Sequence, residues 1–183
     1  AAFMKFVNAR HGTPPADFAS LHRWSVDRME DLWVAVWDFC GIRASGEREP
    51  VLIDADRMPG ARWFPNVRLN FAQNLLRHRD ERCALWFRGE TGQTQELSYA
   101  ELADAVSRLQ QALAAAGVRT GDRVAGFLPN IPEAVVAMLA TTSLGAIWSS
   151  CSPDFGINGV VDRFGQIAPK VLFTAASYAY GGK

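Results

Sequence analysis

Short apolar runs alternate with helical patterns between residues 121 and 175. Three runs, at 124–128, 146–150 and 171–174, are separated by two stretches in which apolar residues recur at helical spacing. Strand-like runs that alternate with helices are typical of βαβ units, in which the strands run parallel. The sequence therefore predicts that these three runs form strands of one sheet and that all three are parallel.

Capping residues predict the ends of the first helix in this stretch. Asn130 and Glu133 have the spacing of a capping box, and Pro132 falls in the first turn, where a missing N–H costs nothing. Gly145 follows Leu144 and can supply the left-handed residue that ends many helices. We therefore expect this helix to be capped by Asn130 and to end at Leu144.

A hairpin and a second amphipathic helix are predicted before the parallel strands. Residues 84–88 and 94–97 are strand-like and flank a GETG turn. Ser98 and Glu101 then form a capping box. Four apolar residues after it share one helix face: Leu102, Val106, Leu109 and Leu113. A lone helix of this length is marginally stable, so the stripe predicts that the helix packs on a sheet.

Helical and aromatic patterns dominate the first 80 residues. From Val26 onward the spacing of the apolar residues is helical, and we expect this Trp-rich stripe to pack on the body of the domain. Residues 41–50 read as a polar linker, and a short helix is expected around residues 69–76. The predicted fold class is therefore α/β, with a helical extension over residues 1–80 and the first part of a parallel-sheet domain over residues 81–183.

Charge and hydropathy exclude two classes of partner. The 19 basic and 19 acidic side chains cancel, so no net charge steers the chain to nucleic acid or to an anionic membrane. Residues 134–153 carry no charge, but Thr142, Gly145 and Ser149 interrupt them, which favours a buried helix and strand over a membrane span. We expect no nucleic-acid partner and no membrane span.

The cysteines indicate a reducing compartment. Cys40, Cys83 and Cys151 are odd in number, far apart and without CxxC spacing. This usage is typical of reduced, buried thiols in a cytosolic protein and does not suggest a disulfide framework or a zinc site. We therefore expect a cytoplasmic protein.

Catalytic motifs are not evident in the residues themselves. His11, His22 and His78 fit no metal-ligand spacing, and the serines near residue 150 lack the frame of a nucleophile elbow. The Gly-Gly-Lys at residues 181–183 lacks the earlier glycine of a phosphate loop. We assign no catalytic residue and no metal ligand to this chain.

A resemblance to a known family extends this interpretation. Residues 63–76 (WFPNVRLNFAQNLL) resemble the N-terminal signature of acetyl- and acetoacetyl-CoA synthetases, in the adenylate-forming superfamily. Residues 97–150 are similar to the first conserved block of that superfamily. Residues 149–175 look like the acetoacetyl-CoA branch, because the acetyl-CoA branch has Gly-Gly-Phe where this chain has Pro153, Asp154 and Phe155. The resemblance covers nearly the whole chain.

The resemblance implies an acid–CoA ligase of lipid and ketone-body metabolism. Such enzymes use ATP and Mg²⁺ to form an acetoacetyl-adenylate and then a thioester with CoA. Their phosphate loop, adenine and ribose motifs and C-terminal lid with a catalytic Lys lie downstream of the matched region, and none is found here. We therefore expect an N-terminal fragment that is inactive alone, holds no cofactor tightly, and has the rest of its own chain, acetoacetate and CoA as partners.

Two alternatives remain open. The parent protein could be another short-chain acyl-CoA synthetase, acting on acetate or propionate, because the acyl pocket of the family lies mostly downstream. The chain could also be a self-standing, non-catalytic α/β binding module.

The resemblance also implies contacts with CoA. Relatives in the acetyl-CoA branch hold the CoA nucleotide with a Phe-Gly-Gly turn, which aligns with Ser152, Pro153 and Asp154. They hold its phosphate with an Arg-x-x-Arg pair, which aligns with Tyr180 and Lys183. Lys183 keeps the charge, Tyr180 offers only a ring, and Asp154 would repel a phosphate. The alternatives are an ordinary surface lysine and an ordinary loop that leads into a helix.

Overall fold

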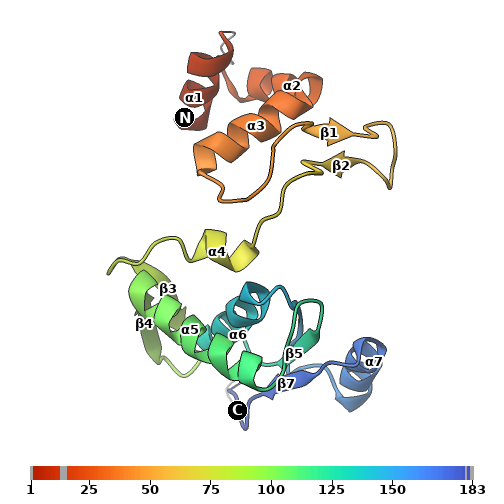
Figure 1. Cartoon of the computed structure of the whole chain (residues 1–183). Coiled ribbons are helices and arrows are strands. Elements are labelled where there is room, and N and C mark those ends of the chain that lie inside the picture. The colour runs from red at the N-terminus through yellow and green to blue at the C-terminus, as the bar shows by residue number, and fades with distance from the viewer. Residues whose placement is uncertain (1, 13–15, 180, 182–183) are drawn as a thin grey trace. The chain divides into compact units, whose positions relative to one another are not determined.

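The chain forms two compact units, residues Ala1–Leu69 and Asn70–Lys183. The structure, a computed structural model, describes residues 2–12, 16–179 and 181 (Figure 1). The two units are described separately below and are called unit 1 and unit 2.

Unit 1 is built from helices and one small antiparallel pair of strands. Its elements are α1 (Ala2–His11), α2 (Phe18–Asp27), α3 (Met29–Cys40), β1 (Leu52–Ile53) and β2 (Arg62–Trp63). The rings of the predicted Trp stripe lie against the β2 region, because Trp33 meets Trp63 edge-on at 6.0 Å and Trp37 lies 5.0 Å from Phe64. Edge-on and tilted aromatic pairs therefore join α3 to β2 and to the residue that follows it.

The helical stretch of unit 1 begins earlier than predicted and is broken once. Asp17 caps α2 by accepting a hydrogen bond from the Ser20 N–H at 2.8 Å. The helix ends at Asp27, and Arg28 has the non-helical angles φ −128° and ψ 55° before α3 begins. The expectation of one helix from Val26 onward was wrong, because the chain bends at an arginine without the Gly or Pro that usually marks a break.

Unit 2 contains the parallel sheet. Its elements are α4 (Phe71–Leu75), β3 (Cys83–Arg88), β4 (Thr94–Ser98), α5 (Tyr99–Ala115), β5 (Arg123–Phe127), α6 (Pro132–Ser143), β6 (Ile147–Cys151), α7 (Ile157–Ile167) and β7 (Val171–Thr174). Strands β3 and β4 form the predicted antiparallel hairpin. Strand β5 lies between β6 and β7 and is parallel to both, which confirms the predicted parallel sheet.

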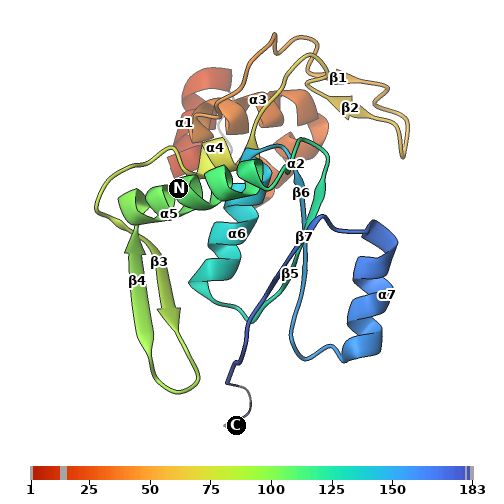
Figure 2. The same ribbon diagram turned by 60° about the horizontal axis from the view of Figure 1, so that its bottom comes forward.

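Helices cover both faces of this sheet. Val124 on β5 belongs to the buried cluster shared with α5 and α6, while its neighbour Ala125 packs with Cys151 and with Phe164 of α7. Successive side chains of a strand point to opposite faces, so α7 covers the face opposite α6. Figure 2 shows α6 and α7 on either side of β5. The sheet of this unit therefore has helices on both faces, and the predicted α/β fold class is confirmed.

Glycine is required at position 126 on the central strand. A Cβ atom there would lie 2.5 Å from the ring of Trp148 on the neighbouring strand β6. Trp148 also contacts Phe173 of β7, with ring centroids 6.2 Å apart. The indole thus lies across Gly126, and any larger residue would have to displace it.

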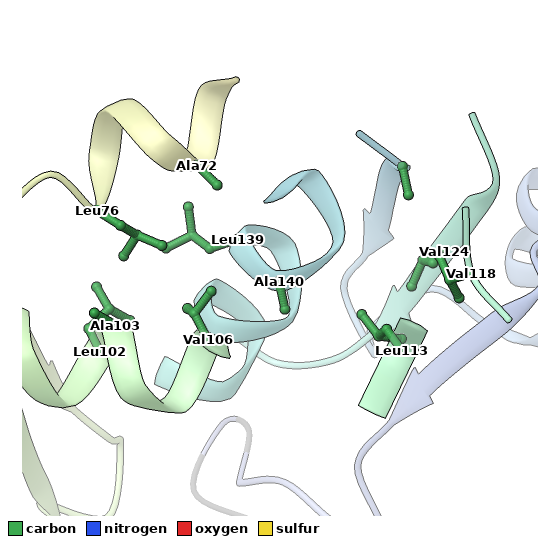
Figure 3. Close-up of a cluster of buried hydrophobic side chains, with 11 residues drawn as sticks. Ala72, Leu76, Leu102, Ala103, Val106, Leu113, Val118, Val124, Leu139 and Ala140 are labelled. Atoms are coloured by element: carbon green, nitrogen blue, oxygen red, sulfur yellow. The ribbon is translucent and has the colours of Figure 1, made fainter. Parts of the chain in front are cut away.

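The predicted capping box of α5 is present, but its apolar stripe packs mainly on another helix. Ser98 N–H donates to Glu101 Oε2 at 2.8 Å, and Glu101 N–H donates to Ser98 Oγ at 3.1 Å. Figure 3 shows Val106 beside Leu139 and Ala140 of α6. The expectation that this helix packs on a sheet is confirmed in part, because α5 contacts the β3–β4 hairpin, while α6, which itself contacts β5 and β6, takes the larger share of the contacts with α5.

Helix α6 begins one residue later than predicted. Ile131 is its N-cap and makes no side-chain capping bond, and Pro132 is the first helical residue. Glu133 is then the second helical residue, not the third, and cannot complete a capping box with Asn130. The predicted end is confirmed, since Leu144 is the C-cap and Gly145 has φ +70°.

The expectation of three buried thiols was wrong for two of them. Cys151, at the end of β6, is buried, while Cys40 and Cys83 are exposed. Both exposed residues terminate an element, Cys40 as the last residue of α3 and Cys83 as the first of β3. Spacing along the sequence carried no information on this exposure.

Across the described residues, every helix is too short or too polar to cross a membrane.

Candidate functional site

The parallel strands of unit 2 end at a cleft of about 440 Å³. Four segments line it: Phe87, Arg88, Gly89, Glu90 and Gln93 of the hairpin; Pro129, Asn130 and Ile131 after β5; Ser152, Pro153 and Asp154 after β6; and Ser177, Tyr178 and Ala179 after β7. In Figure 2 the hairpin tip, the β6–α7 loop and the segment after β7 lie at the same end of the unit. Open α/β sheets bind ligands at the carboxyl ends of their strands, so this cleft is the candidate site.

The loop after β6 forms a compact turn in the cleft wall. Ser152 Oγ donates to Asp154 Oδ2 at 2.9 Å, and the Phe155 N–H donates to the Ser152 carbonyl oxygen at 3.1 Å. These bonds hold the Asp154 carboxylate at a fixed place beside the cleft. The structure therefore brings Ser152, Pro153 and Asp154 together in one wall of the site.

Charges in the cleft are mixed. Among the lining residues that the structure describes, Glu90 and Asp154 are acidic and Arg88 is the single cation. Arg88 is the last residue of β3, and its backbone pairs with Thr94 of β4. Any anionic ligand in the described part of the cleft would therefore have Arg88 as its cationic contact.

A second arginine lies near the β6–α7 loop without lining the cleft. The Arg163 guanidinium stacks 4.2 Å from the Phe155 ring centroid and donates to the Gly159 carbonyl oxygen at 3.0 Å. Burial raises the pKa of the neighbouring Cys151 thiol, and the Arg163 charge opposes part of that rise. The raised pKa disfavours the thiolate, which is the nucleophilic form of cysteine.

An apolar cavity of about 470 Å³ lies elsewhere in unit 2. Its walls come mainly from β4, α5, α6 and β7, and include Leu97, Leu109, Val136 and Phe173. Glu133 is the one ionisable side chain among its described lining residues. The described lining of this cavity thus offers one carboxylate and no cation, and the polar cleft remains the better candidate.

Three of the five residues predicted to contact CoA, Ser152, Pro153 and Asp154, line the cleft. Tyr180 and Lys183, the other two predicted contacts, lie outside the described residues. The rule for strand ends could also have indicated Asn130 and Tyr178, which follow β5 and β7. Arg88 was missed, because nothing in the sequence shows that the hairpin reaches the ends of the parallel strands.

The fold and the cleft together define a class of protein. A parallel sheet covered on both faces, with a polar cleft at the carboxyl ends of its strands, is an α/β ligand-binding domain. A family model described as "AMP-binding enzyme" matches residues 71–181, and the chain belongs to this family.

Similarity to known proteins extends over both units. The acetoacetyl-coenzyme A synthetase of Rhizobium meliloti (strain 1021) is 53% identical over 184 residues, covering 100% of this chain and 28% of that protein. The malonamoyl-CoA synthetase of Penicillium aethiopicum is 40% identical, covering 100% and 26%. A solved structure, acetoacetyl-CoA synthetase from Streptomyces lividans, matches with a TM-score of 0.92 and 47% identity, covering 100% and 29%.

These comparisons confirm the resemblance to acetoacetyl-CoA synthetases and the adenylate-forming fold. The chain spans between 26% and 29% of the length of these relatives. What the relatives catalyse in full therefore bears on this chain only as a proposal.

Proposed function

We propose that this chain is the N-terminal part of an acetoacetate–CoA ligase. The parent enzyme activates acetoacetate with ATP to form acetoacetyl-adenylate and pyrophosphate, and then transfers the acetoacetyl group to CoA with release of AMP. The observation that carries the proposal is the 53% identity to an acetoacetyl-coenzyme A synthetase across 100% of the chain. The branch-specific residues Pro153 and Asp154 support the same acid.

The two parts of the chain take different roles in this proposal. Residues 1–80 form an N-terminal extension, and residues 81–183 form the first part of the AMP-binding domain. The parent protein is cytoplasmic, which agrees with a cysteine usage typical of a reducing compartment. Its product, a thioester of a ketone body, places it in ketone-body and lipid metabolism.

The cleft holds the nucleotide end of CoA in this proposal, through Ser152, Pro153, Asp154, Tyr180 and Lys183. The first three line the cleft at the carboxyl end of β6. Polar side chains and a cation in the cleft suit a phosphorylated nucleotide.

Mg²⁺ is not assigned to this chain. No three His, Cys, Asp or Glu side chains among the described residues lie close enough together to hold a metal ion. By the family resemblance we place the metal ligands, the ATP contacts and the catalytic residues in the remainder of the parent protein, and we expect the 183-residue chain alone to be inactive.

A second candidate acid comes from one relative. The malonamoyl-CoA synthetase of Penicillium aethiopicum matches the whole chain at 40% identity. Malonamate has three carbons and acetoacetate has four, and each acid carries a carbonyl group β to the carboxylate. One pocket could therefore accept either.

Half-reactions of the parent protein test the proposal. We expect acid-dependent ATP–pyrophosphate exchange and CoA thioester formation with acetoacetate, at a kcat/KM at least tenfold above that for acetate, propionate or malonamate. A higher kcat/KM for one of the other three acids would contradict the acetoacetate assignment. Absence of exchange with every acid would instead favour the non-catalytic module.

A further inference from the structure

The proposed CoA site has lost one cation relative to its family pattern. The Arg-x-x-Arg pair that the resemblance predicts for a CoA phosphate aligns here with Tyr180 and Lys183, so one arginine is replaced by a neutral ring. Asp154 adds a negative charge to the cleft. A phosphate in this cleft needs a compensating cation, because like charges in a partly desolvated site repel.

Arg88 is placed to supply that charge. It lines the same cleft as Asp154, although it comes from the hairpin. Hairpin bonds fix its backbone, since Arg88 pairs with Thr94 and the Gly89 N–H donates to the Gln93 carbonyl oxygen at 2.8 Å.

The guanidinium of Arg88 is also available to a ligand. Arg82, on the segment leading into the same hairpin, is neutralised by Asp80 at 2.8 Å. Arg88 forms no ion pair with any residue that the structure describes. A guanidinium can donate two parallel hydrogen bonds to a phosphate, which makes arginine the stronger choice for such a contact.

The exposed position of Arg88 indicates which phosphate it meets. The thiol of CoA has to reach the adenylate for thioester formation, so the nucleotide end of CoA remains toward solvent. Arg88 is exposed at the end of β3, on the rim of the cleft. We propose that Arg88 binds the 3′-phosphate of CoA and makes the enzyme prefer CoA over dephospho-CoA. This inference rests on the proposed function.

The test compares two thiol substrates in variants of the parent protein. Arg88→Gln removes the charge, Arg88→Lys retains it, and Arg108→Gln is the matched control, because Arg108 is an exposed arginine of α5 that does not line the cleft. We expect Arg88→Gln to raise the Kd and KM for CoA roughly tenfold, as for loss of one exposed charge-assisted contact. The values for dephospho-CoA should stay unchanged. Arg88→Lys should keep most of the preference, and Arg108→Gln all of it.

Several outcomes would overturn the inference. Arg88→Gln with an unchanged KM for CoA, or with equal increases for CoA and dephospho-CoA, shows that Arg88 does not contact the 3′-phosphate. Acid-dependent pyrophosphate exchange does not use CoA, so its loss would reveal a folding defect. If Arg88→Gln is misfolded in this way, Arg88→Lys provides the test. An Arg88→Lys variant that keeps pyrophosphate exchange but no longer prefers CoA over dephospho-CoA would also overturn the assignment.

The inference and the proposed function can fail separately. Equilibrium dialysis measures CoA and dephospho-CoA binding without any acid. An Arg88-dependent preference for CoA in a protein that does not activate acetoacetate would support this inference and refute the acetoacetate assignment. A parent enzyme that activates acetoacetate but binds both thiols equally would refute this inference alone.

Discussion

Different kinds of internal contact stabilise unit 1 and unit 2. The larger buried cluster of unit 2 runs from α4 through α5 and α6 to β5, with Leu113, Val124 and Leu139 each at most 3% exposed. Buried apolar side chains in the described part of unit 1 are few and small: Val7, Ala35 and Val51. Its larger side chains stay near the surface, as Trp33 at 45% and Phe39 at 44% exposure show.

Ion pairs connect the segments of unit 1, in which few apolar side chains are buried. Asp38 of α3 pairs with Arg10 of α1 at 2.7 Å and with Arg48 at 2.6 Å. One carboxylate thus connects three segments of the unit. Burial is non-directional and proportional to apolar area, whereas ion pairs near the surface contribute little each. The comparison therefore predicts that core truncation matters most in unit 2 and that single charges matter more in unit 1.

The largest effect is expected from Leu113→Ala. Leu113 is 3% exposed at the end of α5, where it lies beside Val118 and Val124 (Figure 3). Removing its side chain leaves a cavity and should lower the free energy of unfolding by about 2–5 kcal/mol. Urea denaturation monitored by circular dichroism measures this loss.

Leu75→Ala is the matched control for this variant. Leu75 lies in α4 of the same unit but is 47% exposed. Its truncation should cost less than about 1 kcal/mol, because its environment already contains solvent. Equal losses for Leu113→Ala and Leu75→Ala would show that the buried cluster does not dominate the stability of unit 2.

The same contrast explains how far the sequence could predict the fold. In unit 2 the apolar spacing around β5, β6 and β7 gave the parallel sheet, because burial on both faces leaves continuous apolar runs. In unit 1 the break at Arg28 and the short strands β1 and β2 were missed. Those features depend on contacts of exposed aromatic and charged residues, which leave no periodic pattern.

The site was predictable to a similar extent. The resemblance pointed to Ser152, Pro153 and Asp154, which line the cleft at a strand end, and their contact with CoA stays a prediction. Arg88 comes from an antiparallel hairpin outside that sheet. Its approach to the cleft results from tertiary packing of the hairpin on α5, which local sequence cannot specify.

A smaller effect is expected from Asp38→Asn in unit 1. This change removes both ion pairs while keeping the shape of the side chain. Two partly exposed pairs should together contribute about 1 kcal/mol to unfolding, and the difference should shrink at 1 M salt. Denaturation at low and high salt measures both quantities. Asp31→Asn is the control, because Asp31 pairs with Arg28 only three residues away and joins no separate segments. A loss for Asp31→Asn as large as that for Asp38→Asn would contradict the proposed role of Asp38.

The smallest expected effect is a change in the pKa of one carboxylate in unit 2, with one carboxylate in unit 1 as the reference. In unit 2, Lys170 Nζ lies 3.0 Å from Asp122 Oδ2 and joins β7 to the start of β5. The hydrogen bond from Lys170, and then that from the Arg119 N–H, lower the pKa of Asp122. In unit 1, hydrogen bonds from the Ser20 hydroxyl and N–H lower the pKa of Asp17 at the N-cap of α2.

Lys170→Met should raise the pKa of Asp122 toward its ordinary value and leave that of Asp17 unchanged, as followed by carbon-13 NMR of the carboxyl groups. The Arg119 N–H still donates to Asp122 Oδ2 at 2.7 Å, so part of the lowering should persist. A carboxylate with a lowered folded pKa stabilises the protein above the unfolded pKa of about 3.9, and that contribution disappears as pH falls through the folded value. Stability below about pH 4 should therefore depend less steeply on pH in Lys170→Met than in the wild type. An Asp122 pKa that stays at its wild-type value in this variant would show that the backbone bond, and not the lysine, sets the shift.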